Sequence, residues 1–192
     1  MRSLNLILIL SFLSILPAFG EYRGYEAVNT ILAERLISPD SPFGLAVYLG
    51  EPIQRIDNSL RDLLGTYNGS VLGSKFRNGK ANPVSILLWY TAFEGLARDI
   101  VSRCEGEAKS SQKFSERFVQ SLMPLCNWPS GDSKSDSTLF AFWVSLMDFD
   151  APEEEFLAWK AYFTSSESSL YKEVISAMVI SIFMNPHFLL KK

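Results

Sequence analysis

Glu94 is the residue whose position in the sequence comes closest to acid catalysis. It is the one acid inside a strongly apolar stretch with helical spacing. A buried carboxyl group keeps its proton to higher pH, as the acid of a glycosidase must. Such an enzyme also needs a second carboxylate, which Asp99, Asp148 or Asp150 would supply only if the fold brought it close. The interpretation we favour pairs Glu94 with Arg98, four residues on, at the edge of the apolar stripe.

The single histidine and an acidic run have structural interpretations as well. His187 is the only side chain that ordinarily titrates near neutral pH, and it suits a pH-sensitive contact, a general base or a packed residue of the C-terminal tail. We expect the packed residue. Glu153, Glu154 and Glu155 complement the dipole of a helix N-terminus. A calcium site would need further oxygen ligands at loop spacing, and the sequence offers none.

Composition excludes further classes of protein. The chain has 192 residues with a net charge of −3; 47% are hydrophobic and 20% charged, and there are two cysteines and one histidine. This is globular usage, without a basic field to attract nucleic acid. The sequence contains no CxxC, CxxCH, HExxH, GxSxG, GxGxxG or GxxxxGK motif. We therefore expect no cofactor and no metal. The missing motifs also favour a protein without enzymatic activity over an enzyme.

The first twenty residues have the pattern of a signal peptide. Arg2 gives a positive start, residues 4–16 are almost wholly apolar, and Ala18 and Gly20 are small residues at −3 and −1 of a cleavage site. The apolar run is short for a membrane span. We predict cleavage after Gly20, which leaves residues 21–192 as a single helical domain in the periplasm or outside the cell. The alternative is an uncleaved N-terminal anchor.

Export changes how the two cysteines are interpreted. Cys104 and Cys126 both lie in the mature chain, and an oxidising compartment favours a disulfide between them over two buried thiols. A simple helical hairpin would place Cys104 beside Phe114, whereas a disulfide needs Cα atoms within about 7 Å. We therefore predict that the linker 105–113 runs outward across the surface and that the second helix ends near the C-terminus of the first.

Helices are the elements that must position these residues. Apolar residues recur with helical spacing along most of the mature chain, and Asn82-Pro83 is a strong helix start. Residues 43–49 are too short to distinguish a strand from a helical turn. We predict an all-α fold, a single compact bundle of about six or seven helices, with helices over residues 25–37, 58–64, 83–104, 114–123, 139–149, 153–163 and 170–184. The helix at 139–149 should be capped near Asp136 or Ser137, and aromatic residues around Phe140, Phe142 and Trp143 should lie in the core.

Two segments outside these helices have alternative interpretations. The stretch from Gly65 to Asn82 is rich in glycine and asparagine, which predicts a long loop that is either functional or mobile. It contains the sequon at Asn68, which would be glycosylated only in a eukaryotic host. The apolar block from Val174 to Leu190 is marginal for a membrane span and is interrupted by Asn185-Pro186, so we expect a buried final helix there instead of a membrane tail.

The C-terminal segment MVISIFMNPHFLLKK has a recognisable pattern, in which an apolar helix is followed by Asn185, Pro186, Phe188, Leu189 and Lys191. Together with the preceding DFDAPEEEFLAWKAYF, it resembles the helical C-terminal module of secreted cytochrome c-associated proteins of unknown function from myxobacteria and planctomycetes. The resemblance covers about the last 55 residues. It implies an accessory helical module without catalytic residues, although this chain has no haem-binding motif.

Two functions follow from the sequence. The first is an exported helical binding or scaffold protein of the cell envelope, with an envelope or secreted protein as its partner, no nucleic-acid ligand and no stable transmembrane span after signal removal. An exposed apolar patch would support it. The alternative is a small glycosidase-like envelope hydrolase that uses Glu94 as its acid.

Overall fold

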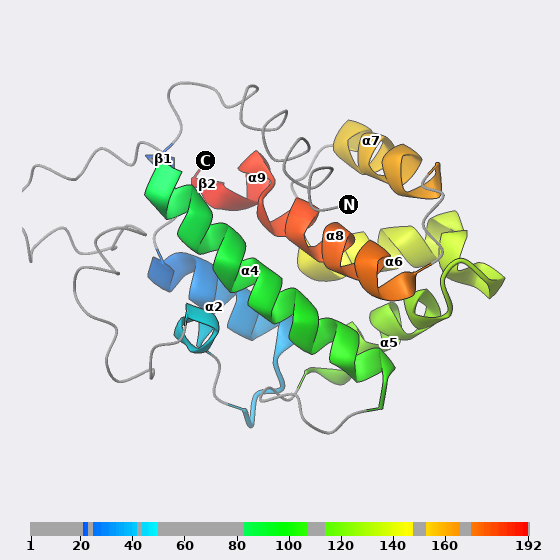
Figure 1. Ribbon diagram of the computed structural model, residues 1–192, viewed down its shortest axis with the longest axis horizontal. Helices are drawn as coiled ribbons and strands as arrows, with labels where there is room; N and C mark the ends of the chain where they lie inside the picture. The colour runs from blue at the N-terminus through cyan, green and yellow to red at the C-terminus, as the bar shows by residue number, and fades with distance from the viewer. Residues whose placement is uncertain are drawn as a thin grey trace, which may run out of the picture.

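The structure is a computed structural model that describes residues 21–22, 25–41, 44–49, 83–106, 114–147, 153–165 and 170–191. The predicted leader, the helix expected at 58–64 and the loop from Gly65 to Asn82, with its sequon at Asn68, lie outside these residues, as do Asp148 and Asp150. Within them the prediction of an all-α fold is confirmed (Figure 1). The α-helices are α2 (Tyr25–Leu36), α4 (Pro83–Cys104), α5 (Glu116–Leu122), α6 (Asp136–Leu146), α7 (Glu153–Thr164), α8 (Tyr171–Phe183) and α9 (Pro186–Leu189).

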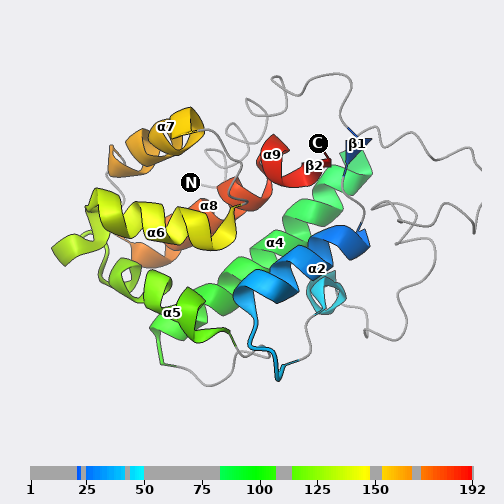
Figure 2. The ribbon, with the colours of Figure 1, turned by 180° about the vertical axis from the view of Figure 1, so that it is seen from behind.

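The long helix α4 is the centre of the bundle. It packs along α8 (Figures 1 and 2), and α2 makes its contacts with α6. Phe93 of α4 is fully buried, and its ring centroid lies 5.4 Å from that of Trp89 and 5.2 Å from that of Phe183 in α8. Helix α4 begins at Pro83 and ends at Cys104, as Asn82-Pro83 and the apolar spacing predicted. Buried aromatic rings on one stripe therefore fix how the two longest helices pack.

Residues 45–49, which the sequence left open between strand and helix, form the 3-10 helix η1 (Leu45–Leu49). The backbone N–H of Leu45 donates to Oδ1 of Asn29 in α2, at 2.9 Å. The Tyr48 hydroxyl donates to Oδ2 of Asp99 in α4, at 2.7 Å. These two bonds link η1 to both helices, and Leu45 is fully buried.

Caps and a proline set the boundaries in the middle of the chain. Ser115 caps α5, with its Oγ accepting from the N–H of Phe118, and Pro124 ends that helix within the 3-10 helix η3 (Met123–Asn127). A third 3-10 helix, η4 (Gly131–Lys134), leads to α6. The cap of α6, predicted near Asp136 or Ser137, is the neighbouring Ser135, which is extended and whose Oγ accepts from the N–H of Thr138. The helix therefore begins at Asp136, three residues before the predicted start at Leu139.

The C-terminus of α6 and the C-terminal strand are held by contacts that the sequence did not predict. The Arg35 side chain, in the last turn of α2, donates to the carbonyl of Met147 at the C-terminus of α6. A cation here satisfies a helix-end carbonyl and complements the helix dipole.

After α8 and α9, strand β2 (Leu190–Lys191) pairs antiparallel with β1 (Glu21–Tyr22). The first residues after the predicted cleavage site thus pair with the end of the chain.

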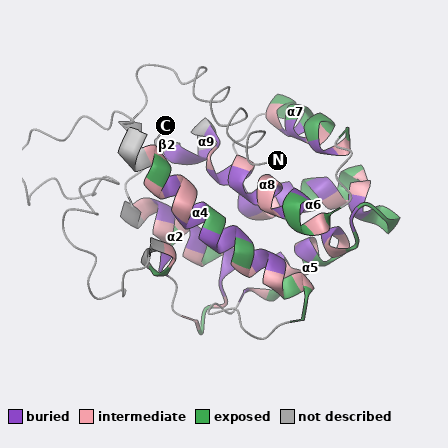
Figure 3. Cartoon of the chain, viewed as in Figure 1, coloured by how far each residue is buried: buried purple, intermediate pink, exposed green. Residues whose placement is uncertain are grey.

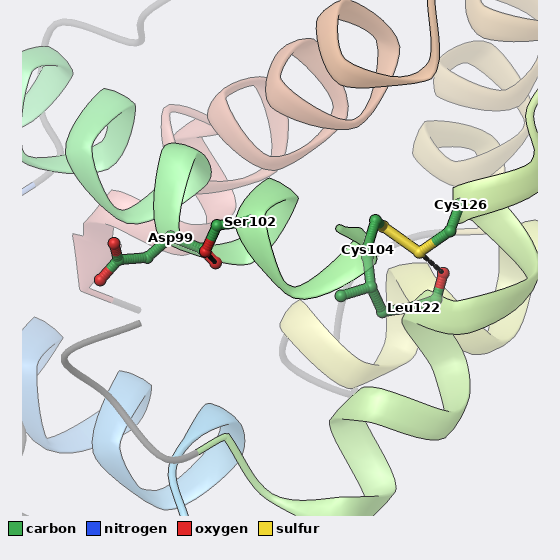
Figure 4. The surroundings of a disulfide bond; sticks show 5 residues. All are labelled: Asp99, Ser102, Cys104, Leu122 and Cys126. Atoms are coloured by element: carbon green, nitrogen blue, oxygen red, sulfur yellow. Dashed lines mark hydrogen bonds between the residues drawn. A yellow bond between two sulfur atoms is a disulfide. The ribbon is translucent and has the colours of Figure 1, made fainter. Parts of the chain in front are cut away.

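The predicted disulfide is present and constrains the helix arrangement as expected. The Cα atoms of Cys104 and Cys126 lie 5.3 Å apart, so α5 and η3 return the chain to the C-terminus of α4 (Figure 4). Sγ of Cys126 lies 3.7 Å from the carbonyl oxygen of Leu122. The part of the linker between residues 107 and 113 lies outside the described residues. The return of the second helix toward the first is therefore confirmed.

The apolar block at the C-terminus is a core element. Helix α8 covers 13 residues, from Tyr171 to Phe183, and Ile175, Met178, Val179 and Ile182 are fully buried. Over the described residues, no helix has both the length and the apolar character needed to cross a membrane.

Candidate functional site

Glu94 does not have the surroundings that acid catalysis requires. Its side chain is exposed on α4, and so is that of Arg98. Asp99, one of the candidate second carboxylates, accepts a hydrogen bond from Tyr48. The neighbour of Glu94 on the helix surface is Tyr90, whose pKa is raised by burial and, secondarily, by the negative charge of Glu94. Glu94 therefore lacks the burial on which the glycosidase hypothesis depends.

Among the described residues, the other candidates are not grouped into a metal site. The backbone of His187 lies in α9, but its side chain is not among those described. Glu155 accepts a hydrogen bond from Asn185 Nδ2 at 3.3 Å, which links the first turn of α7 to the segment after α8. Across the described part of the chain, no three His, Cys, Asp or Glu side chains are grouped as a metal site would need. The acids at the start of α7 match the position that the helix dipole favours.

Helix α7 instead exposes several uncharged side chains close together. It lies at the edge of the molecule, away from α2 and α4 (Figures 1 and 2). Its first turn exposes Glu153 and Glu154. In the next two turns, residues 155–162, every exposed side chain is uncharged: Leu157, Ala158, Ala161 and Tyr162. Leu157 is 46% exposed and Tyr162 40%.

The inner side of α7 explains why its outer side is free. Phe156, Trp159 and Phe163 are all buried, on the stripe that helical spacing places opposite Ala158 and Ala161. The Trp159 ring centroid lies 5.0 Å from that of Trp143 in α6, and its Nε1 donates to Ser181 Oγ in α8 at 2.9 Å. These contacts fix α7 over α6 and α8 through one aromatic stripe. Figure 3 shows buried residues on one side of α7 and exposed ones on the other.

Helix α6 extends the apolar surface beside α7. Phe140 is 51% exposed, and its ring makes an edge contact with Phe156, with the centroids 5.1 Å apart. One turn away, Lys160 Nζ lies 2.7 Å from Asp136 Oδ2. The positive charge of Lys160 beside the contact between α6 and α7 is therefore paired with a carboxylate. Phe140 had been expected in the core with its neighbours. That expectation is wrong, because Phe140 lies about 100° around the helix from the buried Leu139.

We call the exposed residues Phe140, Leu157, Ala158, Ala161 and Tyr162 the α6–α7 face. On α7, Ala161 lies four positions after Leu157 and Tyr162 four positions after Ala158, so the members of each pair are neighbours on the helix surface. The other exposed large apolar residues of the described chain lie on different elements: Val47, Leu87, Met123 and Leu170. A contiguous apolar surface edged by polar residues is typical of an interaction site. In the sequence, Phe140 and Leu157 each follow a buried residue directly, Leu139 and Phe156, and therefore lie about 100° around the helix from it.

Comparison of the chain with models of known protein families, with curated proteins and with solved structures gives no significant match.

Proposed function

We propose that this chain is an exported helical binding or scaffold protein of the cell envelope, which holds a protein partner on the α6–α7 face. The observation that carries this proposal is the set of exposed, uncharged side chains between Leu157 and Tyr162 on α7. An enzyme surface does not need Leu157, Tyr162 and Phe140 in water, whereas an interaction surface gains free energy by burying them.

Two further features support the export part of the proposal. Residues 1–20 have the signal-peptide pattern. The disulfide between Cys104 and Cys126 is of the kind that persists in oxidising compartments and is rare in the cytosol. Cleavage after Gly20 leaves Glu21 as the first residue, which is where β1 begins and pairs with Lys191.

Mass spectrometry of the protein purified from its own host tests export. We expect a chain that begins at Glu21 and contains no thiol that can be alkylated before reduction. A chain with Met1 and two alkylatable cysteines would contradict the proposal.

Site-specific photo-crosslinking in the same host tests the binding surface. A photoreactive amino acid replaces Leu157 in one variant and Gln120, an exposed residue of α5, in the matched control. We expect one or a few discrete crosslinked partners from position 157 and none of these from position 120. Identical crosslinking patterns from the two positions, or no crosslink from position 157, would contradict a dedicated surface on α7.

A further inference from the structure

The charges around the α6–α7 face are asymmetric. Glu153 and Glu154 are exposed at the N-terminal end of α7, and no described cation forms an ion pair with either. Glu153 precedes Leu157 by four residues and Glu154 by three, so both acids border the apolar residues on the helix surface. The cation beside the face, Lys160, is neutralised by Asp136. The face is therefore apolar along its length and negative at one end.

This arrangement is unfavourable for a second copy of the chain. If two α7 helices packed in parallel, Glu153 and Glu154 of each would lie beside the same acids of the other. If they packed antiparallel, the acids would lie beside the C-terminal end of the opposite helix, where unsatisfied carbonyl groups carry partial negative charge. Like charges oppose association in both orientations. A surface of anionic lipid is disfavoured for the same reason.

We infer that the α6–α7 face binds a segment of a partner protein that is apolar where it covers Leu157, Ala161 and Tyr162 and carries lysine or arginine where it meets Glu153 and Glu154. The inference rests on the proposed function and names the chemistry of its partner. The small side chains of Ala158 and Ala161 let the backbone of such a segment approach closely between the larger Leu157 and Tyr162. Burial of the apolar residues supplies affinity, and the two acids set the orientation of the segment.

Two synthetic amphipathic peptides probe this chemistry directly. Both have the same leucine face, and one has a lysine polar face and the other a glutamate polar face. Each is labelled with a fluorophore and titrated with the disulfide-bonded chain 21–192, and binding is followed by anisotropy at low salt and again at about 0.15 M salt. We expect the lysine peptide to bind, with weaker affinity at the higher salt because the exposed charges are screened. The glutamate peptide should not bind.

Variants of the face locate the binding. Glu153→Gln with Glu154→Gln should weaken the affinity for the lysine peptide by roughly three- to tenfold, the effect of losing two exposed charge contacts. Leu157→Ser should weaken it by about tenfold, as for loss of an apolar interface contact. The matched control is Glu116→Gln with Asp132→Asn, which removes two exposed acids from the first turns of α5 and η4.

Several outcomes would overturn the inference. If the control pair weakens the affinity for the lysine peptide equally, the peptide responds to the overall charge of the protein and not to this face. Binding of the glutamate peptide, or unchanged binding by Leu157→Ser, would have the same consequence. A concentration-dependent dimer that Leu157→Ser abolishes would assign the face to a second copy instead. If photo-crosslinking from position 157 identifies a partner whose contacting segment lacks basic residues, this inference fails while the proposed function stands.

Discussion

Gly95 in α4 lies so close to Tyr48 in η1 that a Cβ atom at position 95 would be only 2.7 Å from the Cβ of Tyr48. The Tyr48 Cβ is next to the backbone and cannot move away as the end of a flexible side chain would. Tyr48 is also held by its hydrogen bond to Asp99. The absence of a side chain at position 95 is thus what lets η1 pack on α4.

The first prediction concerns this contact. Gly95→Ala should lower the free energy of unfolding by roughly 1–3 kcal/mol, because overpacking forces η1 away from α4. A loss of stability would be informative, because a glycine-to-alanine substitution within a helix otherwise raises the free energy of unfolding by about 1 kcal/mol. Equilibrium unfolding in guanidinium chloride measures the change. In a Tyr48→Gly background, which removes the opposing Cβ, the same substitution should become neutral or stabilising, and an equal loss in both backgrounds would refute the packing explanation.

The disulfide should contribute a large share of the stability. It joins residues 22 positions apart, and loop closure of this size is worth about 3 kcal/mol on the chain-entropy model. Cys104→Ser with Cys126→Ser should lower the free energy of unfolding by about that amount. Denaturant titrations with and without a reducing agent make the measurement. The reducing agent should have no effect on the double variant, and a similar effect on both proteins would show that it acts elsewhere.

Ser133 in η4 should be stabilised by losing its hydroxyl group. The residue is fully buried, and its Oγ has no hydrogen-bond partner in the described structure. Ser133→Ala should raise the free energy of unfolding by about 1 kcal/mol, because the folded state no longer buries an unsatisfied polar atom. Thermal and denaturant unfolding both report it.

Ser121 of α5 is the matched control for Ser133. Its Oγ lies 3.1 Å from the hydroxyl of Ser145 in α6. Ser121→Ala breaks this contact between helices and should lower the free energy of unfolding by about 1 kcal/mol. Substitutions of the same type should therefore have opposite signs, and a loss of stability at both positions would contradict the account of Ser133.

The packing of α7 against α8 should depend on the hydrogen bond from Trp159 Nε1 to Ser181 Oγ. Ser181→Ala leaves the buried indole N–H without its partner and should lower the free energy of unfolding by about 1 kcal/mol. The tryptophan emission spectrum should change as well. Ser102→Ala is the control, because that hydroxyl donates to the Asp99 carbonyl of its own helix. An unchanged spectrum and unchanged stability in Ser181→Ala would show that the aromatic stripe alone holds α7.

Tyr90 should make stability depend on alkaline pH. Burial and then Glu94 raise its pKa, whereas in the unfolded chain the phenol ionises near pH 10. The contribution is complete below about pH 10 and is lost as the pH rises toward the folded pKa, because the unfolded chain releases its proton first. Tyr90→Phe should therefore reduce the fall in stability above about pH 10, measured by urea unfolding at a series of pH values.

A second measurement separates the two causes at Tyr90. The difference in phenolate absorbance between the parent protein and Tyr90→Phe isolates this one of the seven tyrosines. Glu94→Gln removes the repelling charge and should move that titration to lower pH without restoring the ordinary value, since burial is the larger cause. A shift to higher pH would contradict the assignment.

The sequence by itself determined the all-α class, the course of α4 and the pairing of Cys104 with Cys126, because each depends on local information: apolar periodicity, an Asn-Pro helix start and the redox chemistry of a two-cysteine chain. It did not reveal the cap at Ser135, the contact between Arg35 and Met147 or the exposure of Phe140. Only the tertiary structure decided those, because exposure depends on which neighbouring helix covers a given stripe. Helix α7 packs on α6 and α8 through Phe156, Trp159 and Phe163, so the residues on its remaining surface, from Leu157 to Tyr162, form the exposed apolar face.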